Sequence, residues 1–559
     1  MLRSEFLFLT PPKKKDILSD KPSKYANQRL PKSARTTAGL EPYTGQWTAS
    51  EASHLLRRCL FGFTKSQLEE AKNLGLDALL DKLLEDEPLP SPPLNHYFTQ
   101  DPNVKVGETW VNAPYPEPFE LNEYRTESLR SWRIGLMLNQ GLSIREKMVL
   151  FWQNHFVVQQ TVVGEARFIY QYQNLLRKNA LGNFKTFAEE ITLNPAMLVY
   201  LNGAENRATA PNENYARELL ELFTIGKGVQ RGAGDYTNYT EQDVKAGARV
   251  LTGWWVDWDK LTANFESSFH DTSEKVFSSS FDNKIIKNKE EEEYKELINM
   301  IFSKNETAKY LCRKLYRWFV YYVIDEQVEQ NIIQPLSEIL IDNQFEIKPV
   351  LKALLGSAHF FAPENQGCYI KSPIDFVMSF FKNLEVQMPT DISLYEKYKK
   401  WIILFWHSYL QQQQIDSPPS VAGWSAYYQA PVFQQIWINS ATLMWRSFFV
   451  LGLIYNKLSN DDTDITYDPL LLVESLKEPL DPNKLIEELS SYFFPQPLTD
   501  KQKAFLKNVL IPGLPDFEWT VEYTAYLNDP QNFMKRQAVV LKLRNLFATM
   551  CEMAEFHLS

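Results

Sequence analysis

PNENYARELLELFTIG, residues 211–226, decides the expected fold of this chain, because it has the marks of a short helix at both ends. Asn212 is a residue type that caps helix N-termini, and Gly226 suits the position just after a helix end. Between them, leucines and Phe223 recur at spacings that place them on one face of a helix. The stretch therefore predicts a helix that buries this apolar face against other helices.

The polar residues of the same stretch fall into two stripes. Glu213, Arg217 and Glu221 are spaced four residues apart, which suits ion pairs along a helix, and Asn214 and Glu218 form a neighbouring stripe with the same spacing. One interpretation is a capped surface helix held by local ion pairs. The other is that Glu213, Asn214 and Glu218 point inward and bind a ligand. The sequence leaves both open.

The composition extends the helical prediction to the whole chain. The 559 residues are 44% hydrophobic and 23% charged, which is typical of a soluble globular protein, and the 21 glycines are fewer than usual. Long segments rich in Leu, Glu, Lys and Gln favour helices over sheets. We expect an all-α fold: a large multi-helix assembly, orthogonal or bundle-like, with long irregular loops and a possible small insertion. A net charge of −10 argues against a nucleic-acid-binding surface.

Changes in composition divide the chain into four expected regions. The first is rich in Pro, Lys and Ser and predicts an extended arm. After it, Thr48 and Glu51 form a capping-box pattern at the start of a helix. The regions are an N-terminal arm (1–45), an N-terminal helical domain with the acidic stretch (46–285), a second helical region packed on it (286–455) and a C-terminal helical region (456–559). Within them, 86–120 is a proline-rich loop and 255–285 is polar and irregular.

No segment of the sequence predicts a membrane span or an export signal. No run approaches the roughly 18 apolar residues that cross a bilayer. The first residues, MLRSEFLFLTPPKKKD, contain an apolar run only from Phe6 to Leu9, which is too short for the core of a signal peptide. We therefore expect a cytoplasmic protein, and export together with a partner is left open.

His155, in FWQNHF, is the histidine that we consider as a candidate metal ligand or general base. Histidine is the commonest metal ligand and titrates near neutral pH, although a histidine among aromatic residues is also a common core residue. A catalytic site would combine His155 with Glu213, Glu218 and Asp243, brought together by folding, because no HExxH motif places two ligands on one helix. Helical bundles can build such carboxylate and histidine sites, and the cofactor would then be a divalent metal.

Six further residues are candidates for binding: Asn212, Asn214, Arg217, Arg249, Trp254 and Trp424. The last lies in SPPSVAGW, a rigid Pro/Gly segment of the kind that often shapes binding sites. Each chemical role has a structural alternative. Asp243 lies three residues after Thr240, as the acid of a capping box does, and both tryptophans are of a type that is often buried.

Several motifs, in order, resemble the large bacterial family of domain of unknown function 1800. They cover roughly residues 50–450 and are HLLRRCLFGFT, REKMVLFWQNHF, NPAMLVYLNG, PNENYARELLELFTIG, YTEQDVKAGARVLTGW and PPSVAGW. The resemblance implies a mostly helical bacterial protein whose gene neighbour encodes an alkaline-phosphatase-like or sulfatase-like protein. It supplies no activity. The chain departs from the family pattern at SKNETAKYLCRKLYRWFV, where a His-Pro pair is expected, and at QQQQIDS, where Gly-Gln is expected.

Three functions remain as hypotheses. The first is an accessory protein that binds the alkaline-phosphatase-like companion. The second is a metal-assisted hydrolase with an interior site of His155 and glutamates. The third is a glycan-binding module, since the chain has 14 Trp and 27 Tyr, whose rings can stack on sugars.

Overall fold

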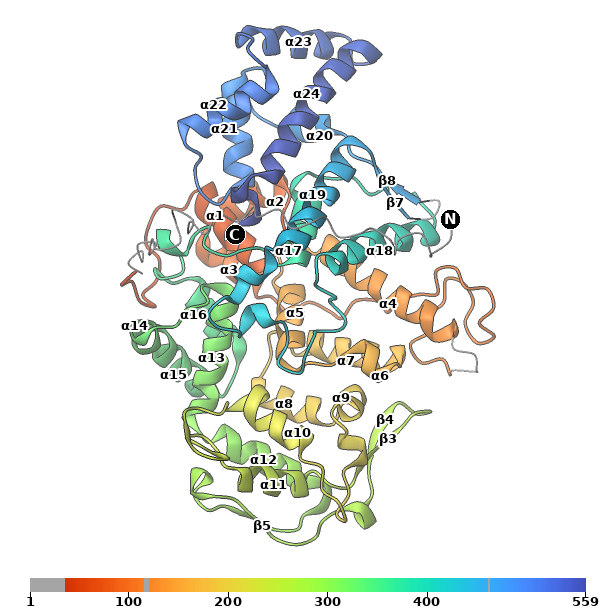
Figure 1. Ribbon diagram of the computed structural model, residues 1–559, viewed down its shortest axis with the longest axis vertical. Coiled ribbons are helices and arrows are strands. Elements are labelled where there is room, and N and C mark those ends of the chain that lie inside the picture. The colour runs from red at the N-terminus through yellow and green to blue at the C-terminus, as the bar shows by residue number, and fades with distance from the viewer. Residues whose placement is uncertain (1–35, 115–119, 390, 461–462) are drawn as a thin grey trace, which may run out of the picture. The chain divides into compact units, whose positions relative to one another are not determined.

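The computed structural model describes residues 36–114, 120–389, 391–460 and 463–559. Residues Thr37–Ser559 pack as one compact unit. Most of the predicted arm therefore lies outside the described residues. The described part of the compact unit is mostly helical, as Figure 1 shows, and the predicted division at 285 and 455 stays a prediction.

Helices of the first half carry the stretches that the sequence marked. Thr48 caps the first helix and forms the predicted capping box with Glu51. The bounds are α1 Ala49–Cys59, α2 Lys65–Leu74, α3 Leu76–Leu83, α4 Glu120–Asn139, α5 Arg145–His155, α6 Gln160–Val163, α7 Ala166–Lys178, α8 Phe184–Thr192, α9 Pro195–Tyr200, α10 Asn214–Glu218 and α11 Glu241–Val250.

Helices of the second half begin after a polar connection and continue to the C-terminus. Their bounds are α12 Glu293–Phe302, α13 Asn305–Phe319, α14 Glu326–Val328, α15 Gln334–Asp342, α16 Ile347–Leu355, α17 Pro373–Asn383, α18 Leu394–Leu410, α19 Ser440–Tyr455, α20 Pro469–Glu474, α21 Pro482–Phe493, α22 Asp500–Leu510, α23 Phe517–Asn528 and α24 Phe533–Glu552.

Short strands correct the all-α prediction to a mostly helical fold. Three two-stranded antiparallel sheets lie between positions 230 and 286, and a fourth follows α19. The region expected to be irregular is thus organised by hairpins, in which each strand pairs with the next. The strands are β1 Gln230–Gly232, β2 Asp235–Tyr236, β3 Trp254–Asp257, β4 Thr262–Phe265, β5 Lys275–Val276, β6 Ile285–Ile286, β7 Leu458–Asn460 and β8 Thr463–Ile465.

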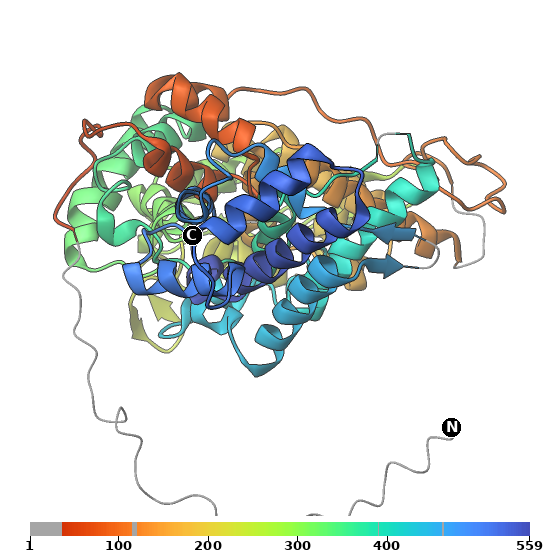
Figure 2. The ribbon, with the colours of Figure 1, turned by 90° about the horizontal axis from the view of Figure 1, so that it is seen from above.

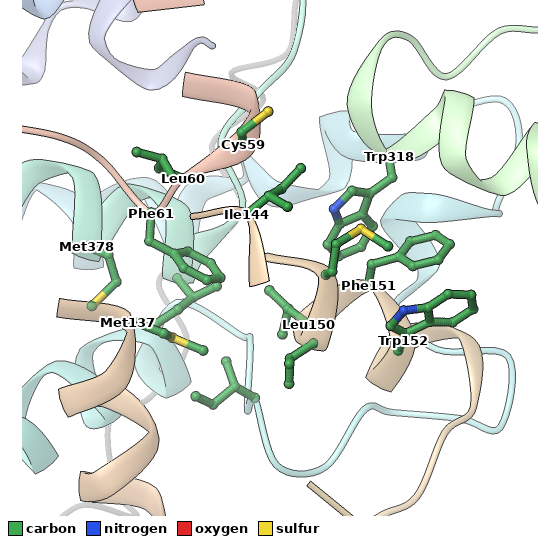
Figure 3. Packing of buried hydrophobic residues seen from close by; sticks show 14 of the residues in the cluster. Cys59, Leu60, Phe61, Met137, Ile144, Leu150, Phe151, Trp152, Trp318 and Met378 are labelled. Carbon is green, nitrogen blue, oxygen red and sulfur yellow. The ribbon is translucent and has the colours of Figure 1, made fainter. Parts of the chain in front are cut away.

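One hydrophobic core runs through the compact unit and joins helices that are far apart in the sequence. Figure 3 shows Phe61, which follows α1, packed near Met137 of α4 and Met378 of α17, with Phe151 of α5 beside Trp318 of α13. All five side chains are buried. Burial of large apolar side chains is the main force that holds such helices together.

The C-terminal helices pack against the first helices of the chain. Figures 1 and 2 show α21, in blue, close to α1 and α2, in red. Arg57 donates a hydrogen bond to the carbonyl of Tyr492 at 2.8 Å, and the Tyr492 hydroxyl donates to the carbonyl of Phe63 at 3.0 Å. The two ends of the compact unit therefore stabilise each other.

The last residues of the predicted arm are part of the compact unit. The backbone of Tyr43 donates to the carbonyl of Gly356 at 2.9 Å, and Ala358 donates to Glu41 at 2.8 Å. The arm, where the structure describes it from position 37, is thus paired with the segment after α16. No helix among the described residues combines the length and the apolar character needed to cross a membrane.

Candidate functional site

The acidic stretch forms α10, which continues into a π-helical turn from Leu219 to Thr224. Glu213, one residue later than predicted, occupies the capping position, although Asn212 Oδ1 does accept the N–H of Asn214 at 2.9 Å. Gly226 ends the helix with a φ of +71°, in the left-handed conformation that glycine adopts most easily. π-Helical turns are rare overall, and many of those known lie at functional sites.

Arg217 is held by two carboxylates on the outer side of α10. It binds Glu213 at 2.9 Å, the predicted pair four residues apart, and both oxygens of Glu241 on α11 at 2.7 Å. Glu221 pairs with Lys227 at 2.6 Å instead of with Arg217. The stripe of Glu213, Arg217 and Glu221 is therefore a set of ion pairs at the surface, as the first interpretation of the sequence expected.

Glu218 differs from the other acids of the stretch. It is half-buried and has no hydrogen bond or ion pair to any residue that the structure describes. Burial, followed by the negative charge of Glu221, raises the pKa of Glu218 to about 7. Asn214, which precedes it on the same stripe, donates to the carbonyl of Leu201 at 3.3 Å. Glu218 is therefore the candidate that can gain or lose a proton near neutral pH.

We expect Glu218→Gln to raise the free energy of unfolding at pH 8 and to change it little at pH 4. An acid whose pKa is raised by folding contributes stability below its unfolded pKa of about 4.3, and loses that contribution as the pH rises through about 7. Glutamine cannot ionise, so the variant avoids the loss. Urea denaturation at both pH values measures it. Glu213→Gln, which breaks an ion pair with Arg217, should show no gain, and an equal effect of Glu218→Gln at both pH values would contradict the assignment.

His155 reaches the backbone of this helix rather than its carboxylates. Its Nε2 donates to the carbonyl of Phe223 at 2.8 Å, whereas Nδ1 is buried without a hydrogen-bond partner among the described residues. The rings of Trp152, Phe156 and Phe184 surround it. Burial, followed by the positive charge of Lys314, lowers the pKa of His155 well below its usual value. His155 is therefore an enclosed histidine whose hydrogen bond goes to the backbone of the turn.

Two residues of α13, which the sequence analysis missed, bind the same turn. The Tyr310 hydroxyl donates to the carbonyls of Glu221 and Leu222 at 3.2 and 3.1 Å, and Lys314 Nζ donates to Leu222 at 2.8 Å. Burial, followed by the charge of Arg317, lowers the pKa of Lys314 to about 7. Together with His155 they bind the carbonyls of residues 221–223, which we call the π-turn clamp. Carbonyls at a helix end have no partners inside the helix, so such donors stabilise it.

Asp243 and Arg249 have structural roles on α11 and its surroundings. Asp243 is fully buried and accepts the N–H and hydroxyl of Thr240 at 2.7 and 3.0 Å, so the predicted capping box is confirmed. Its carboxylate also accepts the N–H and hydroxyl of Ser278, each at 2.6 Å. Arg249 binds Asp271 at 2.6 Å instead of the acidic helix. Both side chains thus link α11 to the hairpin region by hydrogen bonds.

The two tryptophan candidates are buried, whereas two other tryptophans reach the surface. Trp254 and Trp424 are buried, and the backbone N–H of Trp424 donates to Asn154 at 2.8 Å. Trp255 and Trp258 instead line a surface cleft of about 310 Å³ with three hydrogen-bonding side chains, those of Asn202, Glu205 and Arg207. Side chains alternate between the two faces of a strand, so neighbours in β3 have opposite surroundings.

The predicted catalytic set is therefore divided among several places. In the described part of the chain, His155 binds a carbonyl and no carboxylate, Glu213 binds Arg217, and Asp243 caps α11. Nowhere among the described residues do three or more His, Cys, Asp or Glu side chains lie close enough together to hold a metal ion. What the geometry does bring together is the π-turn clamp, with the titratable Glu218 one residue before the turn.

Comparison with known proteins adds one match. The family model described as protein of unknown function (DUF1800) matches residues 54–546. The match extends beyond the quoted motifs, through most of α24. No curated protein and no solved structure matches the chain.

Proposed function

The chain belongs to the DUF1800 family, and from this premise we propose that it is an accessory protein that binds an alkaline-phosphatase-like companion. The companion is the one implied by the resemblance of the motifs. The observation that supports a protein-binding role is the outward face of α19, on which exposed apolar side chains gather.

The α19 face consists of Leu443, Met444, Phe448, Leu451 and Tyr455. Four of them are exposed, Phe448 by 56%, and Leu451 is half-buried. They lie on one side of the helix, at spacings of one, four, three and four residues. Monomeric soluble proteins rarely leave such a stripe in water, and exposed apolar patches mark interaction sites.

The single charged residue of α19 points away from this face. Arg446 is buried and donates to the carbonyl of Lys371 at 2.8 Å and to His557 at 3.1 Å. The inner side of the helix packs on the core, where Phe449 lies 5.0 Å from the ring of Phe380. The α19 face is thus fixed in place by its inner side. A rigid surface on which Met and aromatic side chains gather resembles the centre of a protein interface, which is enriched in these residue types.

We expect Phe448→Glu to weaken binding of the companion by at least about 30-fold, since truncating a central aromatic anchor costs about 2 kcal/mol or more. Phe448 is exposed, so the melting temperature should stay the same or rise. The measurement is calorimetric titration with an alkaline-phosphatase-like protein of the kind that the resemblance implies as the gene neighbour.

The matched control is Phe505→Glu on α22, where a phenylalanine with 53% exposure receives the same charge. It should bind as the wild type does. Failure of the wild-type chain to bind the companion would reject the proposal. Concentration-dependent dimerisation that Phe448→Glu abolishes would assign the α19 face to a second copy, and loss of binding to lipid vesicles would assign it to a membrane; either result would also reject the companion.

The two alternatives stay predictions. A glycan-binding module would use the cleft of Trp255 and Trp258, where rings and polar side chains lie together. A metal-assisted hydrolase would have to use Glu218, the acid near the π-turn clamp that no described residue binds.

A further inference from the structure

A cavity lined by residues from both halves of the chain lies apart from the acidic stretch. It has a volume of about 810 Å³ and lies between α2, α4, α17 and α18. This volume falls within the range of small-molecule sites. Its walls include the apolar side chains of Leu138, Phe381 and Trp401, one from each of α4, α17 and α18.

Lys382 brings a buried positive charge to this cavity. Its side chain lines the wall, and the residue is only 7% exposed. Nζ donates one hydrogen bond, to the carbonyl of Gln140 at 3.1 Å, and no carboxylate pairs with it among the described residues. Burial lowers the pKa of Lys382 to about 8. An ammonium group has three hydrogen-bond donors, and only one of those of Lys382 is used by the carbonyl of Gln140. Burying such a group without a counter-ion is energetically costly.

The other charged groups of the wall already have partners. Lys65 binds Glu488 at 2.7 Å, and Glu69 pairs with Lys72 at 3.6 Å. Glu385 accepts the backbone N–H of Lys65 at 2.8 Å. Lys397 lies over the ring of Trp401, 5.0 Å from its centroid. These contacts leave Lys382 as the buried charge of the wall that lacks a counter-ion.

We propose that this cavity binds a small amphipathic carboxylate, a molecule with one carboxylate group and an apolar body. The carboxylate would accept hydrogen bonds from Lys382, and the body would lie against Leu138, Phe381 and Trp401. A charge-assisted bond to a buried ammonium group is stronger than the same bond in water, so this site selects an anion over a neutral molecule of equal size. The proposal is independent of the α19 face and of the companion protein.

Calorimetric titration at pH 7 with octanoate, 1-octanol and octylammonium tests the proposal. Octanoate should bind at least about tenfold more tightly than octanol, and octylammonium should bind most weakly, since one charge-assisted hydrogen bond is worth about 1.5 kcal/mol or more. Lys382→Met keeps the length of the side chain and removes its charge. In this variant the preference for octanoate over octanol should disappear.

Two further variants make the result specific. Lys245→Met, at an exposed lysine of α11, should bind octanoate as the wild type does. Leu138→Trp should fill the cavity and abolish binding of all three probes, which keeps the test valid if Lys382→Met fails to fold. No octanoate binding to the wild type, or equal binding to wild type and Lys382→Met, would overturn the proposal. Phe448→Glu should leave octanoate affinity unchanged, so failure here is distinct from failure of the companion hypothesis.

Discussion

Glu293→Ala should lower the free energy of unfolding by about 3–5 kcal/mol, the cost of removing one partner from a buried ion pair. Glu293 and Lys275 are fully buried and lie 2.6 Å apart. His270 Nε2 and the N–H of Lys289 also lie 3.0 Å from Glu293 Oε1. Without the carboxylate, Lys275 remains as a buried cation without its counter-ion.

The loss of stability in Glu293→Ala should depend on pH and be larger at neutral pH than in acid. Burial acts to raise the pKa of Glu293, but hydrogen bonds from His270 and Lys275 outweigh it, and the pKa is lowered. A lowered pKa contributes stability above the unfolded value of about 4.3, and this is lost as the pH falls through the folded pKa. The difference between wild type and variant should therefore be full at pH 7 and smaller at pH 3. Urea denaturation at both pH values measures it.

Glu292→Ala is the matched control, because it removes the adjacent glutamate. Glu292 pairs with Lys295 at the surface at 2.9 Å, so its loss should cost no more than about 1 kcal/mol. Equal losses for the two variants would show that the buried cluster contributes no more than a surface pair.

His155→Ala should lower the free energy of unfolding by about 3 kcal/mol and leave the metal content unchanged. The variant loses the bond to the carbonyl of Phe223 and opens a cavity between aromatic rings. Denaturation with urea measures the stability, and elemental analysis of both purified proteins measures the metal. Tyr310→Phe, which removes only the hydroxyl bonds of the π-turn clamp, should cost about 1 kcal/mol.

The opposite pattern would reverse the assignment of His155. If the wild type holds a metal in fixed proportion and His155→Ala loses it while keeping its stability, His155 is a ligand and the hydrolase alternative gains its support. A wild type without metal that is clearly more stable than the variant leaves the π-turn clamp as the role of this histidine.

Local features of the fold could be predicted from the sequence, because their interactions span only three or four residues. The capping boxes of Thr48 and Thr240, the glycine end at Gly226 and the pair of Glu213 with Arg217 all belong to this class. Each depends on the spacing of a helix turn, which is the same in any helix. The family followed from the order of such motifs.

The candidate site and the hairpins depended on segments far apart in the sequence. Tyr310 and Lys314 meet the carbonyls of residues 221–223 only after α13 packs beside the π-turn, and no spacing along the chain indicates this. The same holds for Glu293, which looks like one more acid in a charged run but lies buried against Lys275.

The exposure of the α19 face is the clearest example of a feature that the sequence alone does not determine. The stretch SATLMWRSFFVLGLIY is rich in apolar residues, which are ordinarily buried in a folded protein. Tertiary packing covers only its inner side and leaves Met444 and Phe448 in water. The side chains of a helix determine which of its faces can be buried. Which faces are buried in fact depends on the helices that pack against it, and those helices come from distant parts of the chain.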